Sequence, residues 1–149
     1  KYKAYEKAGC ETYFNKKDHL WTLYEYETGQ FKLPENAEKG MIYGGCNCGN
    51  CHITISSNGD VMACRRVTDS KVANVFEDRM ADVWVCQMEK YRDYDRFEKC
   101  SKCELKAWCR GCPAVANGTS GNFYAPDPQC WKTRNEITGE KLLMEAASQ

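Results

Sequence analysis

Cysteine is the residue type whose number and spacing in this sequence could support chemistry. The chain has eleven cysteines and two histidines among 149 residues. Thiolates bind zinc and iron, and each iron–sulfur cluster takes four cysteines, often at irregular spacing with one distant ligand. The candidate ligands are Cys46, Cys48, Cys51, Cys64, Cys100, Cys103, Cys109, Cys112 and Cys130. A pair of four-cysteine clusters would use eight of these nine residues.

Disulfides and zinc are the alternative explanations of the same cysteines. Disulfide scaffolds are usually short, secreted and even in cysteine number, whereas this chain is longer and its number is odd. Zinc favours Cys-x2-Cys pairs separated by roughly 12 to 20 residues, but the pairs Cys100–Cys103 and Cys109–Cys112 are five residues apart. Iron–sulfur clusters fit the pattern best, and a zinc-binding interaction module is the alternative.

Charge and hydropathy argue against two kinds of partner. Lys plus Arg and Asp plus Glu both number 21, so the formal net charge is zero. Electrostatics therefore give no reason to expect nucleic acid or an anionic membrane. No apolar run approaches the roughly 18 to 20 residues that a membrane span needs. The sequence does not begin with Met and shows no targeting leader, and we expect it to be a piece of a longer protein.

A β-hairpin is expected to position the cysteines on either side of residue 58. Asn58-Gly59 is the strongest short hairpin signal, because both central residues of a type I′ turn need positive φ. In such a two-residue loop Ile53 pairs with Cys64, and Cys51 lies diagonal to Cys64, within reach of a common cluster. The residues predicted to share one face are Cys51, Ile53, Ile55, Met62 and Cys64. A shift of one residue in the register would break this inference.

Helices are expected before and after the hairpin. Asp18 is a plausible N-cap for a helix over His19–Glu27, and Gly29 is its predicted stop. The apolar residues of 77–97 follow helical spacing, which predicts one or two amphipathic helices facing a core. Cys86 lies beside that apolar stripe, and we expect it to be a thiol without a ligand role.

The remaining segments are expected to be less regular. Residues 30–45 are predicted to form a connecting segment. Residues Cys103–Cys109 are enough for one and a half helical turns. Regular structure should then be broken by Pro113, Gly118, Gly121, Pro126 and Pro128. Metal ligation would compensate for the entropy of ordering such a loop. Residues 134–149 are predicted to form a last helix.

The order of the cysteines resembles that of a known family. Cys46 precedes a hairpin glycine, Gly59, and Cys64 follows it by five residues; then come a Cys-x2-Cys-x5-Cys-x2-Cys run and one last cysteine. The run and the last cysteine are Cys100, Cys103, Cys109, Cys112 and Cys130. This pattern resembles the SPASM domain, the C-terminal auxiliary-cluster domain of radical S-adenosylmethionine (SAM) enzymes. Supporting segments are Ile55–Val61, Asn74–Trp84 and Asp127–Cys130, although the family's third gap has three residues and this one has two.

The resemblance implies a fold and a set of ligands. The fold would be α+β, a small, irregular, cysteine-rich domain whose β-hairpin and helices are organised around two [4Fe-4S] clusters. The ligands of the second cluster would be Cys100, Cys103, Cys109 and Cys130. Those of the first would be Cys46, Cys64 and Cys112, with Cys48 or Cys51 as the fourth. The chain would divide into the end of a catalytic barrel or bridge (1–43), the SPASM domain (44–132) and a C-terminal helix (133–149).

The resemblance also implies a role within a larger radical SAM oxidoreductase. Enzymes of that superfamily bind SAM at a cluster held by Cys-x3-Cys-x2-Cys, and no three cysteines here have this spacing. SAM and a third [4Fe-4S] cluster are therefore expected in a barrel of the same protein. The domain would transfer electrons or position substrate, and a purely structural cluster scaffold is a further alternative. Basic residues that could balance cluster charge are Arg65, Arg66, Lys102, Lys106 and Arg110.

The substrate that the resemblance implies is a ribosomally made precursor peptide. Many members of the family are peptide maturases in the biosynthesis of ribosomally made, modified peptides (RiPP). The phrases around Cys46–Gly49 and Cys64–Arg66 resemble those of maturases that form carbon–carbon crosslinks, such as a Lys–Trp link. Reduced thiols and the supply of SAM would place the protein in the cytoplasm.

Overall fold

The computed structural model describes residues 2–13 and 20–132, and it combines short helices with one small sheet. The helices are α1 Tyr2–Lys7, α2 Leu20–Glu27, α3 Met80–Asp82 and α4 Pro113–Ser120. The strands are β1 Thr54–Ile55, β2 Asp60–Met62 and β3 Lys71–Asn74. Short 3-10 turns occur at Thr68–Ser70, Glu89–Arg92, Tyr94–Arg96 and Cys100–Lys102. The predicted α+β class is confirmed, while the predicted helix over 134–149 lies outside the described residues.

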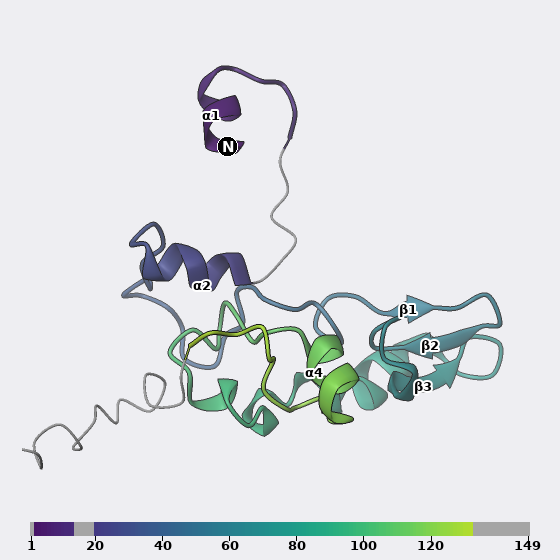
Figure 1. The fold of residues 1–149 in the computed structure, drawn as a ribbon. Coiled ribbons are helices and arrows are strands. Elements are labelled where there is room, and N and C mark those ends of the chain that lie inside the picture. The colour runs from purple at the N-terminus through teal and green to yellow at the C-terminus, as the bar shows by residue number, and fades with distance from the viewer. Residues whose placement is uncertain (1, 14–19, 133–149) are drawn as a thin grey trace, which may run out of the picture.

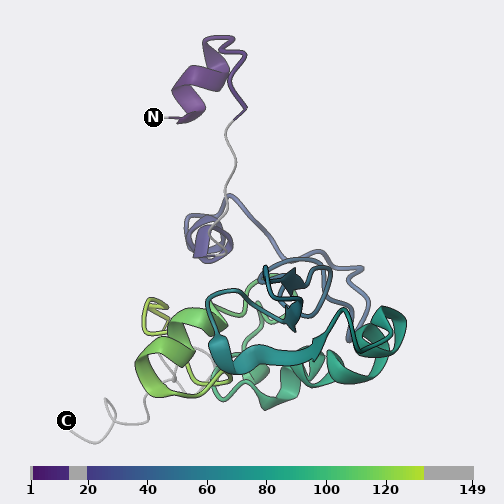
Figure 2. The ribbon, with the colours of Figure 1, turned by 90° about the vertical axis from the view of Figure 1, so that its right-hand side faces the viewer.

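The sheet and helix α2 lie at opposite ends of the folded body in the view of Figure 1. Figure 2 looks from the sheet end and shows α4 on one side of the sheet and the helical turns after β3 on the other. Helix α2 ends as predicted at Gly29, whose φ is 69° and whose N–H donates to the Tyr26 carbonyl at 3.1 Å. The predicted N-cap Asp18 lies outside the described residues, as does His19. Within residues 2–13 and 20–132, no helix has the length and apolar character that crossing a membrane requires.

The hairpin forms, but its register differs by one residue from the prediction. Ile55 is opposite Val61, and a three-residue loop joins the strands. The Ser56 N–H donates to the Asp60 carbonyl and the Gly59 N–H donates to the Ser56 carbonyl, both at 2.9 Å. Gly59 has a φ of 85°, whereas no residue other than glycine has positive φ in the described chain. The turn is therefore a type I turn followed by a left-handed glycine, not the predicted type I′ turn.

The observed register changes which residues share a face of the hairpin. Side chains alternate between faces, so Ile53 lies on the face of Val61 and Ala63, both of which are fully buried. Cys64 belongs to the opposite face. The predicted common face of Cys51 and Cys64 is wrong, because a shift of one residue moves every side chain of a strand to the other side.

Strand β3 and the π-helical turn after α3 were not predicted. Strand order is β1-β2-β3, with Val61 opposite Ala73 in the second antiparallel pair. The segment 77–97 then forms α3, the π-helical turn Val83–Gln87 and two 3-10 turns, rather than one or two regular helices. Its apolar stripe does face the core as expected, since Val83, Met88 and Tyr91 are buried.

Helix α4 corrects the expectation that Pro113 and Gly118 would break regular structure. Proline suits the first turn of a helix, because its missing N–H has no partner to lose there, and Pro113 occupies that position. Gly118 lies inside the helix. Gly121 ends it with a φ of 72° and an N–H that donates to the Asn117 carbonyl at 2.8 Å. The helix buries Ala116 against the core.

Two groups of buried apolar residues flank the cysteines. The larger core lies between the sheet, the helical turns and α4, and includes Val61, Ala63, Val83, Met88, Tyr91, Phe97 and Phe123. The smaller core joins Leu23 of α2 to Leu105, with Phe31 and Leu33 packed against it. Cys46, Cys48 and Cys64 belong to or pack on the larger core, and Cys103, Cys109 and Cys130 belong to or pack on the smaller one. Burial of apolar surface thus positions both sets of thiols.

Candidate metal centre

Four cysteines from three separate segments lie together beside the sheet. We call Cys46, Cys48, Cys64 and Cys112 the first cysteine group. A hydrogen bond with the Cys48 thiol lowers the pKa of Cys46 to about 6. The same bond, then burial, then the negative charges of Cys46, Cys64 and Cys112 raise the pKa of Cys48. The four sulfurs are therefore close enough for the charge of each to affect Cys48.

A second set of four lies near α2. We call Cys100, Cys103, Cys109 and Cys130 the second cysteine group. Burial and, after it, the negative charges of Cys103, Cys109 and Cys130 raise the pKa of Cys100 to about 12. Burial likewise raises the pKa of Cys109 to about 11. Within residues 2–13 and 20–132, no three or more cysteine, histidine or acidic side chains converge as the ligands of one metal ion do.

The loop 46–52 turns one of two candidate cysteines inward and the other outward. The Asn47 carbonyl accepts the N–H groups of Asn50 and Cys51 at 3.0 and 3.1 Å, which closes a tight turn. Cys48 is 5% exposed, whereas Cys51 is exposed to solvent. Gly49 allows this turn to pack closely, because a Cβ there would lie 2.7 Å from Cβ of Tyr91. The structure therefore brings Cys48, and not Cys51, next to the other members of the first cysteine group.

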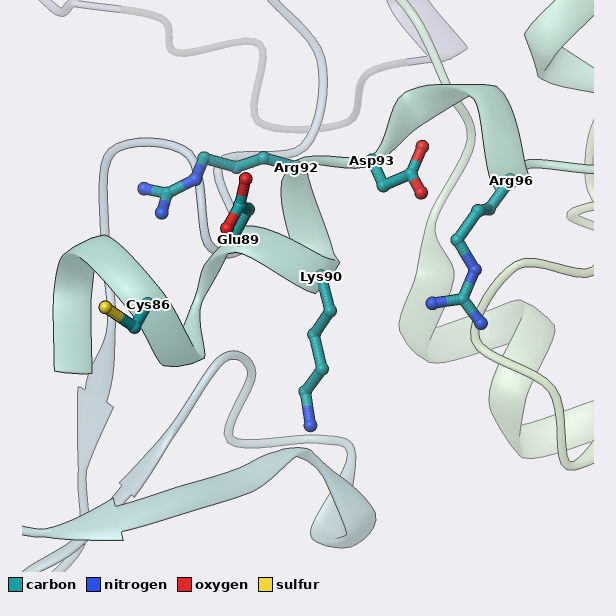
Figure 3. A pocket seen from close by; sticks show the side chains of 6 residues that line it. All are labelled: Cys86, Glu89, Lys90, Arg92, Asp93 and Arg96. Atoms are coloured by element: carbon teal, nitrogen blue, oxygen red, sulfur yellow. The ribbon is translucent and has the colours of Figure 1, made fainter.

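Cys10 and Cys86 are also exposed to solvent. Cys86 lines a shallow pocket of about 650 Å³ that Figure 3 shows, together with Glu89, Lys90, Arg92, Asp93 and Arg96. Two of its cations already have partners. Arg92 donates to the Trp84 carbonyl at 2.6 Å, and the Arg96 guanidinium lies 4.1 Å from the centre of the Tyr124 ring. The lining contains none of the nine candidate ligands.

Asp127 joins the two cysteine groups. Its carboxylate is buried, and its Oδ2 accepts the N–H of Cys112 at 2.6 Å while Oδ1 accepts the N–H of Gln129 at 2.8 Å. The Asp127 carbonyl accepts the N–H of Cys130 at 3.0 Å. One residue therefore holds the backbone of a cysteine from each group. Sequence reasoning noted the Asp127–Cys130 segment but not this bond to Cys112, since residues far apart in sequence make it.

Ser70 fixes the backbone at Cys64 in a similar way. The Cys64 N–H donates to Ser70 Oγ at 3.1 Å, and the Ser70 hydroxyl donates to the Cys64 carbonyl at 3.0 Å and to the Val67 carbonyl at 2.5 Å. Ser70 is buried. The loop between β2 and β3 is thus closed on itself, and Cys64 leaves the sheet in a fixed direction.

Arg110 differs from the other basic candidates because it is buried. Arg110 is 3% exposed. Its guanidinium donates to the carbonyls of Gly44 and Lys106 at 2.8 Å and of Cys46 at 3.1 Å. It lies 4.5 Å from the centre of the Tyr94 ring. Burial lowers the pKa of Arg110, while the neighbouring phenol of Tyr94 and thiols of Cys46, Cys109 and Cys100 oppose that shift. A positive charge therefore lies between members of both cysteine groups, whereas Arg65, Arg66 and Lys102 are exposed.

Tyr94 Oη provides a test of whether the first cysteine group suits a larger prosthetic group. Among the residues that the structure describes, it is a buried side-chain oxygen without a hydrogen-bond partner. Buried hydroxyls are nearly always paired, because an unpaired one costs about 1–3 kcal/mol. Sulfur atoms of an iron–sulfur cluster accept hydrogen bonds. Four neighbouring thiols, a buried cation and an unpartnered donor therefore fit such a cluster.

The comparisons with known proteins agree with this chemistry. A family model described as the SPASM iron–sulfur cluster-binding domain matches residues 46–113. The match includes every candidate ligand except Cys130, which lies beyond it. The chain is also 30% identical over 108 residues to an AdoMet-dependent heme synthase from Nitratidesulfovibrio vulgaris strain Hildenborough.

The similarity to this relative covers most of the chain but a minor part of the relative. The aligned region is 70% of this chain but 29% of the length of the relative. No solved structure matches the chain significantly. The expected resemblance is confirmed at the level of the domain, by a family model and by a relative whose name states a dependence on AdoMet. Residues 46–113 of the chain therefore match the SPASM family of iron–sulfur cluster-binding domains.

Proposed function

We propose that this chain is the auxiliary-cluster part of a radical SAM enzyme and that it holds two [4Fe-4S] clusters. The observation that carries the proposal is the gathering of eight cysteines into two groups of four, in which the charges of three neighbouring cysteines act on Cys48 and on Cys100. Each [4Fe-4S] cluster takes four thiolates. The two groups therefore provide a complete set of ligands for two clusters.

The proposed ligands follow from these groups. Cys46, Cys48, Cys64 and Cys112 would hold the first cluster, and Cys100, Cys103, Cys109 and Cys130 would hold the second. Cys48 is chosen over Cys51 because it is buried beside Cys46, whereas Cys51 is exposed. Cys109 and Cys112 are close in sequence and serve different clusters, so the residues between them, Arg110 and Gly111, connect the two sites.

The role of the domain would be electron transfer, positioning of substrate, or both. When bound, each cluster can accept or release one electron near the reacting substrate. The chain's own residues hold the sites dry and compensate charge. Tyr91 and Phe123, with ring centres 5.0 Å apart, belong to the core beside the first group. Arg110 supplies a buried cation between the groups, and such charge changes the reduction potential of a cluster.

The catalytic reaction would take place with a part of the protein that this chain does not contain. SAM and a third [4Fe-4S] cluster would be bound by a barrel carrying Cys-x3-Cys-x2-Cys, a spacing that is absent from residues 1–149. That barrel would be the main partner of the domain. Its end, or the bridge after it, would be residues 1–43, and the requirement for SAM and reduced thiols favours the cytoplasm.

Two substrate classes are proposed for the complete enzyme. A ribosomally made precursor peptide, with a carbon–carbon crosslink such as Lys–Trp as product, follows from the sequence phrases around Cys46 and Cys64. Heme synthesis is favoured by the 30% identity to the AdoMet-dependent heme synthase. Incubating the complete reduced enzyme, with its SAM-binding barrel, with SAM and each class of substrate separates them, because mass spectrometry detects the modified peptide or the new tetrapyrrole.

A pair of variants tests the two-cluster proposal. Cys64→Ser removes a ligand of the first cysteine group and Cys109→Ser removes one of the second, and Cys86→Ser is the matched control. Each ligand variant should lose about four iron atoms per chain and a different signal in the electron paramagnetic resonance (EPR) spectrum. The control should lose neither. Loss of the same signal in both ligand variants, or bound zinc without sulfide, would contradict the proposal.

A further inference from the structure

Tyr94, in the 3-10 turn Tyr94–Arg96, lies against Arg110 and packs on the core that contains Cys48. Its hydroxyl oxygen is buried and, within the part of the chain that the structure describes, has no hydrogen-bond partner. Tyrosine hydroxyls that are buried usually find a partner. An acceptor is therefore expected next to the Tyr94 hydroxyl.

The neighbours of Tyr94 exclude most acceptors. Arg110 lies 4.5 Å from the ring centre, but a guanidinium only donates hydrogen bonds. The ring of Phe97 stacks on Tyr94 with centroids 6.4 Å apart and offers no acceptor in its plane. Tyr94 packs on the larger core, which contains Cys48 and on which Cys46 and Cys64 also pack. The sulfur atoms of the first cysteine group are therefore acceptors on the same side of the fold.

The hydroxyl is suited to donate rather than to accept. Burial is the largest cause of the raised pKa of Tyr94, and it outweighs the positive charges of Arg110 and Arg92 that lower the pKa. A tyrosine phenol, whose ordinary pKa is about 10, keeps its proton at neutral pH. A protonated phenol beside sulfur atoms that carry negative charge is a hydrogen-bond donor.

We propose that the Tyr94 hydroxyl donates a hydrogen bond to a sulfur atom of the cluster held by the first cysteine group and raises the reduction potential of that cluster. The inference rests on the proposed function, because it needs a cluster at that group. A hydrogen bond to sulfur stabilises the more negative, reduced state more than the oxidised state. Tyr94 would thus be a positioning residue that tunes one cluster and not the other.

The second cysteine group has a tyrosine neighbour that differs in this respect. The negative charge of Cys103 is among the causes that raise the pKa of Tyr26, after the hydrogen bond to Glu104 and burial. Tyr26 therefore lies close to Cys103, but its hydroxyl donates to Glu104 Oε2 at 2.8 Å. Because that donor is already used, the two groups differ in the donors that they offer to a cluster.

Tyr94→Phe tests the proposal, with Tyr26→Phe as the matched control. Both variants keep the ring, and Tyr94→Phe keeps the face that lies under Arg110. The full chain is purified anaerobically and titrated by EPR, with the first-cluster signal assigned as the one lost in Cys64→Ser. Tyr94→Phe should lower the equilibrium constant for reduction of that cluster about tenfold, or about 59 mV for a one-electron couple. Tyr26→Phe should leave it unchanged.

Three results would overturn the proposal, and only the third would also contradict the proposed function. An unchanged midpoint in Tyr94→Phe, with full iron content, would exclude the hydrogen bond and leave the two-cluster function intact. Lower iron content with an unchanged midpoint in the remaining cluster would assign Tyr94 a packing role only. Wild-type protein without iron and sulfide would remove both the proposal and the proposed function.

Discussion

Cys48 and Cys51 are three residues apart, yet the loop that carries them places one among thiols and the other in solvent. Residue type identified both as candidate ligands, and spacing alone left the choice open. The decision depends on the turn closed by Asn47 and on the contact of Gly49 with Tyr91. Neither the turn nor the contact has a sequence signal that reasoning from one sequence could read.

The first prediction concerns these two residues. Cys48→Ser should lower bound iron by about four atoms per chain, because one cluster loses a ligand. Cys51→Ser should bind as much iron as the wild type. Iron and sulfide analysis of the two variants, purified side by side without oxygen, measures the difference. If Cys48→Ser binds as much iron as the wild type, or if Cys51→Ser loses iron, the assignment of Cys48 rather than Cys51 as the ligand is contradicted.

At the scale of elements, sequence predicted the existence of the hairpin and not its register. Asn58-Gly59 occurs in two-residue and three-residue loops, and in the structure only Gly59 takes positive φ. The Asn58 side chain instead accepts from the Asp60 N–H at 3.3 Å and donates to the Asp60 carboxylate at 3.0 Å. These local bonds favour the longer loop, which a motif of two residues could not reveal.

Helix α4 and strand β3 show why the other elements were missed. Pro113 and Gly121 were interpreted as breakers, although proline at the start and glycine past the end are also the signals of a helix. Lys71–Asn74 is a short strand whose pairing with β2 depends on the closed loop at Ser70. The apolar stripe over Val83, Met88 and Tyr91 was predictable, since it follows from periodicity alone.

The second prediction tests the observed turn. Gly59→Ala should destabilise the protein by about 1–2 kcal/mol or more, because alanine resists positive φ. Its Cβ would also lie 2.6 Å from the Phe76 ring. Gly118→Ala, in a helix and with no atom within 4 Å, should instead stabilise by about 0.5–1 kcal/mol. Chemical denaturation of both variants measures the difference; equal effects would contradict the turn assignment.

The third prediction concerns how the elements around the two cysteine groups are joined. Asp127→Ala removes the acceptor of the Cys112 N–H and should destabilise the protein by about 1.5–3 kcal/mol, since a charged acceptor is lost from a buried site. Asp82→Ala is the control, because its side chain is 67% exposed and pairs loosely with Arg79. The control should change stability by less than about 0.5 kcal/mol. Similar thermal shifts in both variants would show that Asp127 does not join the groups.

At the scale of the whole molecule, the fold has little regular structure to hold residues 100–132 in place. Leu23 and Leu105 form the centre of a small core there, and Cys109 completes it. The Arg110 side chain connects this region to the loop before the sheet by donating to the carbonyls of Gly44 and Cys46. Within the region, the Asp127 carboxylate accepts the N–H of Cys112. If the proposed clusters occupy the cysteine groups, they would supply part of the stability of this fold.

The fourth prediction follows from that dependence. Removing the clusters with a chelator and an oxidant should abolish cooperative unfolding, because the binding energy of a structural metal site, about 10–16 kcal/mol for zinc, is as large as the roughly 5–15 kcal/mol that stabilise an ordinary domain. Circular dichroism and thermal melts before and after removal measure the change. A cluster-free protein with an unchanged melting transition would show that the clusters are not structural.

The central claim is that two iron–sulfur clusters occupy the two cysteine groups. Its most direct test is the iron, sulfide and zinc content of the 149-residue chain purified without oxygen, together with its visible spectrum. We predict about eight iron and eight sulfide per chain and a broad absorption band near roughly 400 nm. Zinc without sulfide, or no metal with the thiols paired as disulfides, would contradict the claim.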